Sequence, residues 1–191
     1  MSLILGILAQ DVAGAGGGTS YESIATVTVG SGGAADVTFS SIPGTYTHLQ
    51  IRGIARSTAA QNLAGLRMQV GNGSIDTATN YSGHILYGDG SGVAATSSAN
   101  QSQMNIGVVS AANDTVSSFA GLVLDLLDYA NSNKYKTTRS LCAVDLNGSG
   151  AVEFHSSSWR STSTVTTVKL YATAGNFAQY SHFALYGIKG A

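Results

Sequence analysis

Residues 119–159 read FAGLVLDLLDY (119–129), ANSN (130–133), KYKTTRSLCAVDL (134–146), NGSG (147–150) and AVEFHSSSW (151–159). Three runs rich in apolar and β-branched residues are separated by two short clusters of Asn, Gly and Ser. This pattern is typical of consecutive antiparallel strands joined by hairpin turns. The stretch therefore predicts the middle of a β-sandwich. Its most apolar part, residues 122–127, predicts a strand buried on both faces.

The same pattern continues on both sides of this stretch. Apolar and polar residues alternate in eight further segments, which we expect to be strands: 24–29, 36–40, 48–56, 66–70, 81–87, 104–109, 163–171 and 182–188. Gly53 is expected to form a β-bulge, and residues 71–80 and 88–100 are expected to be exposed loops. About ten strands predict an all-β fold, an antiparallel two-sheet sandwich of jelly-roll-like type, over residues 21–191.

An apolar N-terminal arm, residues 1–20, is expected to precede this domain. Its linker is rich in glycine and reaches roughly 15 Å over eight residues, so the arm can dock on a neighbouring molecule. The alternative is a first edge strand or short helix on the same sandwich. The arm is shorter than the ~20 apolar residues that span a bilayer. The expected anchor residues are Leu3, Ile4, Leu5, Ile7 and Leu8.

Composition indicates a surface suited to packing between subunits. Only 10% of the residues are charged, against roughly 25% in an average soluble protein. The net charge is −1 and the nine basic residues are scattered, so we expect no nucleic-acid partner. No Lys or Arg precedes Arg52, which argues against a secretory signal peptide. Cys142, the only cysteine, is expected to be a buried thiol.

No catalytic motif, cofactor fingerprint or metal-ligand spacing is found, so we expect no catalytic, cofactor-binding or metal site and no enzyme. The four histidines are expected to face solvent or a subunit contact. Calcium binding by loop aspartates is a weaker alternative. These residues are His48, His84, His155, His182, Asp76, Asp89 and Asp114.

Trp159 and Arg160 suggest a possible contact with a saccharide. An exposed aromatic ring beside a polar side chain can stack on a sugar ring, and Asp89 in the expected 88–100 loop is a further candidate for host contact. The alternative is that Trp159 lines the core or a subunit interface.

Three segments resemble small structural proteins of tailed bacteriophages: HLQIRGIAR (48–56), HFALYGIKG (182–190) and LILGILA (3–9) with the linker that follows it. The resemblance covers the whole chain and carries over no catalytic residue. It implies a trimeric virion component that is assembled in the bacterial cytoplasm and displayed on a capsid or tail.

The energetics of the arm favour an oligomer. Burying five aliphatic side chains contributes about 7–15 kcal/mol, while ordering about eight residues costs on the order of 8–16 kcal/mol. For a single arm, the free energy gained by burial and the cost of ordering nearly cancel. Three arms that dock together on a homotrimer gain effective concentration.

Two functions are expected from these observations. The first is a capsid-exterior decoration or cement protein, bound to the major capsid protein through the arm. The second is a receptor-binding tip, bound to a tail adaptor, that recognises a glycan of the host surface. A depolymerase is not supported, because no convergent carboxylates can be assembled.

Overall fold

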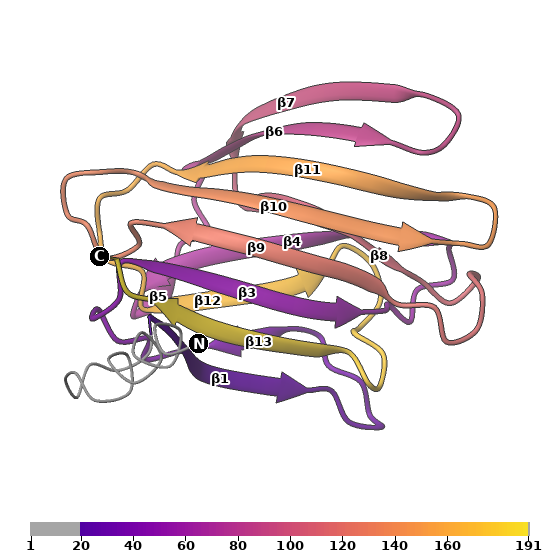
Figure 1. Ribbon diagram of the computed structural model, residues 1–191, viewed down its shortest axis with the longest axis horizontal. Coiled ribbons are helices and arrows are strands. Elements are labelled where there is room, and N and C mark those ends of the chain that lie inside the picture. Colours follow the sequence, from indigo (N-terminus) through magenta and orange to yellow (C-terminus); the bar gives the residue numbers. More distant parts are fainter. Residues whose placement is uncertain (1–19, 191) are drawn as a thin grey trace, which may run out of the picture.

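The computed structural model describes residues 20–190, which form two antiparallel β-sheets packed face to face (Figure 1). No helix occurs in this range, and hence none that could span a membrane. The predicted antiparallel two-sheet sandwich is confirmed. Its strands are β1 (Tyr21–Thr28), β2 (Val37–Phe39), β3 (His48–Ala55), β4 (Leu63–Asn72), β5 (Ser74–Ile75), β6 (Tyr81–Gly88), β7 (Val93–Gln101), β8 (Met104–Ser110), β9 (Ala120–Leu127), β10 (Lys136–Asp145), β11 (Gly150–Trp159), β12 (Thr167–Ala172) and β13 (His182–Ile188).

The larger sheet has eight strands in the order β1-β13-β3-β9-β10-β11-β6-β7. The smaller sheet has the order β2-β12-β4-β5, and β8 also pairs with β4. The hairpins expected between residues 119 and 159 are β9, β10 and β11, in the middle of the larger sheet. Ser140 on β10 lies opposite Leu124 on β9 and His155 on β11.

The hydrophobic core lies between the two sheets. Because side chains alternate along a strand, every second residue points into this space. The larger sheet supplies residues such as Leu49, Ile51, Leu124 and Phe183, and the smaller sheet supplies residues such as Leu66, Met68, Val70 and Leu170. Cys142 is buried as predicted.

The prediction that residues 122–127 are buried on both faces is wrong. Along β9 the buried positions alternate with exposed or partly exposed ones, and Val123 is 40% exposed. The smaller sheet covers only one face of the larger sheet, so the outward apolar side chains of β9 face solvent in the described chain.

Gly53 does not form the predicted bulge. It lies in regular register opposite Phe183 on β13 and Leu122 on β9. A Cβ atom at this position would lie 2.5 Å from Cδ1 of Phe183. Glycine is therefore required by the aromatic ring packed across the strand, and not by an irregular backbone.

The expectation that residues 88–100 form an exposed loop is also wrong. Only a short turn follows β6, closed by a hydrogen bond from the Asp89 N–H to the Gly92 carbonyl, and the chain then returns as β7. The small polar residues of β7 carry a weak strand signal, but they pair with β6 along most of its length. The β6–β7 hairpin extends beyond the edge of the smaller sheet (Figure 1).

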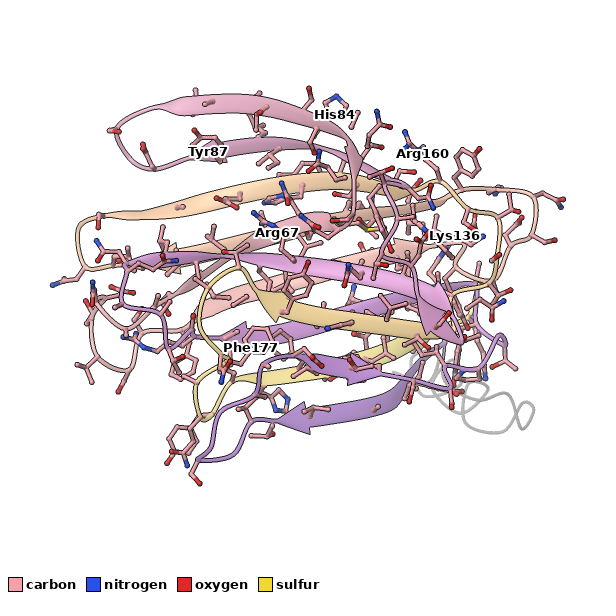
Figure 2. The ribbon with its side chains drawn as sticks, turned by 180° about the vertical axis from the view of Figure 1, so that it is seen from behind. Arg67, His84, Tyr87, Lys136, Arg160 and Phe177 are labelled. Carbon is pink, nitrogen blue, oxygen red and sulfur yellow. The ribbon has the colours of Figure 1, made fainter. Side chains whose placement is uncertain are left out.

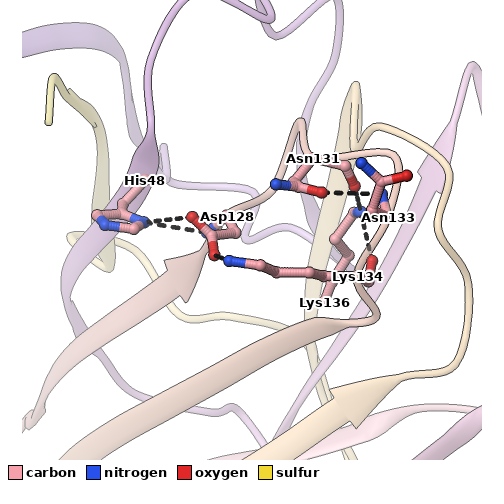
Figure 3. Close-up of polar contacts among 6 residues, drawn as sticks. All are labelled: His48, Asp128, Asn131, Asn133, Lys134 and Lys136. Carbon is pink, nitrogen blue, oxygen red and sulfur yellow. Dashed lines mark hydrogen bonds and ion pairs between the residues drawn. The ribbon is translucent and has the colours of Figure 1, made fainter.

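The turn between β9 and β10 is held by a buried lysine (Figure 3). Lys136 is fully buried, and its ammonium group donates hydrogen bonds to the carbonyls of Asn131, of Lys134 at 2.9 Å and of Thr162 at 3.1 Å. Burial lowers the pKa of this ammonium group. Nearby, Lys134 forms an ion pair of 2.6 Å with Asp128.

Candidate assembly surface

Apolar side chains gather on the outward face of the larger sheet, the face turned away from the core. Val123, Leu141, Phe154 and Leu86 lie directly opposite one another on the adjacent strands β9, β10, β11 and β6. A second row beside them contains Ile54 on β3, Val152 on β11 and Val93 on β7, with glycine or alanine on the strands between. We call these seven residues the apolar stripe.

The apolar stripe is large for a surface feature. Its members are between 40% and 84% exposed. With roughly 150–200 Å² for each large side chain, they expose on the order of 600–700 Å², against about 300–600 Å² for the largest patch on a typical monomer. A stable protein interface buries about 800 Å² on each partner. The stripe is therefore of the size needed to form most of one side of an interface.

Two shallow hollows give the stripe a shape that a partner can fill. Gly121 and Ala143 leave a hollow of about 500 Å³ between Ile54, Val123 and Leu141. A second hollow of about 330 Å³ lies where Gly88 separates the larger side chains of β6, β7 and β11. Protruding and recessed apolar groups together allow the close packing found at the centre of protein interfaces.

A hydrogen-bonded polar network borders the stripe along the same strands. The Asp125 carboxylate pairs with Arg139 at 3.2 Å and accepts a hydrogen bond of 2.8 Å from the Gln50 amide. Gln50 in turn accepts hydrogen bonds from Arg52 at 2.9 Å and from the Tyr21 hydroxyl at 2.7 Å. An apolar centre with a polar rim is the usual anatomy of a protein–protein interface.

Trp159 is not available to stack on a saccharide. Its side chain is buried at the end of β11, as the core alternative predicted, and its indole Nε1 donates a hydrogen bond of 2.7 Å to Asp76. The sequence places a tryptophan beside Arg160 but does not show that the alternation along β11 turns the ring inward.

Arg160 and Asp89 lie at opposite ends of β6, so the structure does not bring the proposed host contacts together. The Arg160 guanidinium donates hydrogen bonds to the Thr79 carbonyl at 2.6 Å and to Oδ1 of Asn100 at 2.8 Å, near the start of β6. Asp89 follows the end of β6, where its carboxylate accepts hydrogen bonds from Ser91 and Gly92. Tyr87 and Arg160 mark these two ends in Figure 2.

The expected anchor residues Leu3, Ile4, Leu5, Ile7 and Leu8 lie outside the described residues. The described chain begins beside the end of β13, where the Lys189 N–H donates a hydrogen bond of 2.9 Å to the Ser20 carbonyl.

The expectation that all four histidines face solvent or a subunit is wrong for His155. This side chain is 2% exposed, because its position on β11 points toward the smaller sheet. Its Nε2 atom lies 2.8 Å from Oε2 of Glu153. Within residues 20–190, no three His, Cys, Asp or Glu side chains form a group that could hold a metal ion.

The stripe was not predicted from the sequence, although one signal for it was present. Neighbouring residues such as Leu122 and Val123, or Leu141 and Cys142, are both apolar, so each pair places one apolar group on each face of the sheet. For residues 122–127 this pattern predicted a strand buried on both faces. No family model matches the chain, and the comparisons with curated proteins and with solved structures likewise gave no match.

Proposed function

We propose that the protein is a structural subunit of a larger protein assembly, a virion component that docks on a neighbouring protein through the apolar stripe. The observation that carries this proposal is the size of the stripe together with its polar rim. An exposed apolar patch of this extent is a liability for a free monomer, and it is typical of a surface that a partner covers.

The kind of assembly follows from the resemblance to tailed-phage structural proteins. A capsid-exterior decoration or cement protein needs a broad docking face and little charge repulsion between neighbouring subunits. The stripe supplies the docking face. The low proportion of charged residues, 10%, keeps the charge repulsion between subunits small. We propose the major capsid protein as the partner, with the N-terminal arm as a second anchor.

The alternative of a receptor-binding tip has less support. It relied on an exposed Trp159 and on a long loop at residues 88–100, whereas Trp159 is buried and most of that segment is β7. No described feature favours glycan recognition over protein docking.

The proposal can be tested with phage particles that lack this chain. Purified full-length protein is added back, and the bound amount is compared for the wild type and for Leu141→Asp. The charge should reduce binding at least tenfold, because it places an unpaired carboxylate at the centre of the interface. Thr137→Asp is the matched control, since it is an exposed position on β10 outside the stripe, and it should bind like the wild type.

Deleting residues 1–12 tests the arm in the same assay, and we expect a folded sandwich with reduced binding. Equal binding by wild type and Leu141→Asp would contradict docking through the stripe. Staining of host cells by the labelled protein alone, or turnover of host polysaccharide, would favour the receptor-binding or enzyme alternatives.

A further inference from the structure

β7 is an edge strand of the larger sheet. It is hydrogen bonded to β6 on one side, and no strand of residues 20–190 pairs with it on the other. Its sequence, VAATSSANQ, contains no charged residue and no proline, and seven of its nine residues are exposed. Edge strands of soluble proteins are normally protected by lysine, proline, bulges or a covering segment, because their free N–H and C=O groups can pair with another chain.

The opposite edge of the same sheet is protected. There β1 carries Glu22, whose carboxylate accepts hydrogen bonds from Lys189 at 2.6 Å and from Tyr46 at 3.0 Å. The pairing of β1 also shifts register between Ser23 and Ala25. On β7 the register is regular from Val93 to Ser98, and its one irregularity falls after that run. The two edges of one sheet therefore differ in how readily they can accept a further strand.

The position of β7 leaves room for a second molecule. The β6–β7 hairpin projects past the smaller sheet, as the strands above β11 in Figure 1 and the region of His84 and Tyr87 in Figure 2 show. A strand added beside β7 would therefore lie clear of the smaller sheet of the same copy.

We infer that β7 is an assembly edge at which two copies of the chain pair antiparallel, about a twofold axis perpendicular to the sheet. Centred on Thr96, this pairing sets Thr96 against Thr96 of the second copy, Ala95 against Ser97 and Ala94 against Ser98. These partners are small and uncharged, so neither bulk nor repulsion opposes the approach, and Thr–Thr pairs favour it. Isologous pairing of this kind is the commonest route to a closed dimer, and it differs from the homotrimer expected from the sequence.

The geometry has a consequence for the apolar stripe. An axis perpendicular to the sheet keeps the outward faces of both copies on the same side, so two eight-stranded sheets join into one of sixteen strands. The stripe reaches β7 at Val93, which this register sets against Ala99 of the second copy, so the stripe of each copy ends at the junction. The pair would thus present two apolar stripes on one face of the joined sheet. The pairing is expected between copies of the purified protein. Its test is therefore separate from the test of docking to a particle.

Sedimentation velocity of the full-length protein tests the pairing. We expect a dimer for the wild type, and at least tenfold weaker dimerisation for Thr96→Lys, because lysine on an edge strand opposes strand addition. Leu141→Lys is the matched control, since it introduces the same charge on the stripe three strands away from β7, and it should remain dimeric. A monomeric wild type, a trimer, or a dimer that only Leu141→Lys disrupts would overturn the inference.

Cysteine cross-linking gives a second readout that does not depend on the lysine variant. Thr96→Cys should form a disulfide-linked dimer under mild oxidation. The two cysteines at position 96, one from each copy, would lie directly opposite each other across the antiparallel pair, within disulfide range. Ala95→Cys and Ser97→Cys report a twofold axis displaced by one residue, which shifts the register by two residues. The native Cys142 is buried, and Ser132→Cys, at an exposed position in the β9–β10 turn, should not cross-link. Cross-linking at position 132 equal to that at all three β7 positions would contradict the pairing. The absence of cross-linking at every β7 position would contradict it as well.

Discussion

The indole Nε1 of Trp159 donates a hydrogen bond to Oδ2 of Asp76, 2.7 Å away, and so ties the end of β11 to the segment after β5. The same carboxylate accepts hydrogen bonds of 2.8 Å from the Asn80 amide and from the Ala78 N–H. Burial alone would raise the pKa of Asp76, but these three hydrogen bonds together hold the pKa below its usual value. The ionised carboxylate is thus the form that the folded state favours.

Asp76→Asn should lower the free energy of unfolding at neutral pH by about 1.5–3 kcal/mol, the usual range for a hydrogen bond to a charged group. Because the folded pKa is below the ordinary value of 3.8, the stabilisation is present above that value and is lost as the pH falls through the folded pKa. The difference between wild type and variant, measured by urea denaturation, should therefore narrow below about pH 4. A difference that stays constant down to pH 2 would assign the effect to shape and not to charge.

Lys136→Met should be strongly destabilising. The variant removes the donor shared by the carbonyls of Asn131, Lys134 and Thr162, and each buried group left without a partner costs about 1–3 kcal/mol. Lys134→Met is the matched control, because its ammonium group is exposed and its ion pair with Asp128 is worth at most about 1 kcal/mol. Denaturant titration of both variants measures the contrast. Equal, small losses would mean that water replaces the Lys136 ammonium group.

The central hairpins could be predicted from the sequence because their signals are local. Along β10, buried and exposed residues alternate from Lys136 to Asp145, and the Asn-Gly and Asn-Ser-Asn clusters mark the turns on either side. The burial of Cys142 follows from the same alternation. A period of two residues specifies a strand and its two faces wherever one face is covered.

The remaining features depend on contacts between distant segments, which a local pattern does not contain. The sequence shows that β9 has apolar residues on both faces, but only the extent of the smaller sheet decides that Val123 faces outward. The strand character of β7 comes from pairing with β6 and not from its own small residues. No local pattern marks Lys136 as a buried residue, although the turn and the segment after β11 enclose it completely.

Gly53→Ala should destabilise the sandwich by about 1–3 kcal/mol, the usual cost of overpacking a core. The added methyl group would lie 2.5 Å from the ring of Phe183, which is fully buried and has little room to move. Gly121→Ala is the control on the neighbouring strand, since nothing lies within 4 Å of its Cβ position. Thermal and urea unfolding of both variants should separate them clearly, and equal stability would show that the Phe183 ring can shift.

The Cys142 thiol should be unreactive in the folded protein. Burial raises its pKa to about 11, and its Sγ donates a hydrogen bond of 3.0 Å to the Val108 carbonyl. At pH 8 about one thiol in a thousand would then be ionised, and the thiolate is the reactive form. Labelling with a disulfide reagent such as DTNB should therefore be at least a hundredfold slower in buffer than in denaturant. Rapid labelling of the native protein would show that β10 opens locally.

Replacing Leu141 and Phe154 together by serine should raise solubility with little loss of stability. These two side chains lie opposite each other at the centre of the apolar stripe and are about half exposed, and a cross-strand pair contributes only about 0.2–1 kcal/mol. Leu124→Ser, at a fully buried position on β9, should instead cost about 2–5 kcal/mol, as large core truncations do. Salt-induced precipitation measures solubility, and urea titration measures stability. If the double variant lost as much stability as Leu124→Ser, the stripe would have to be covered within its own chain, and its role as a docking surface would be excluded.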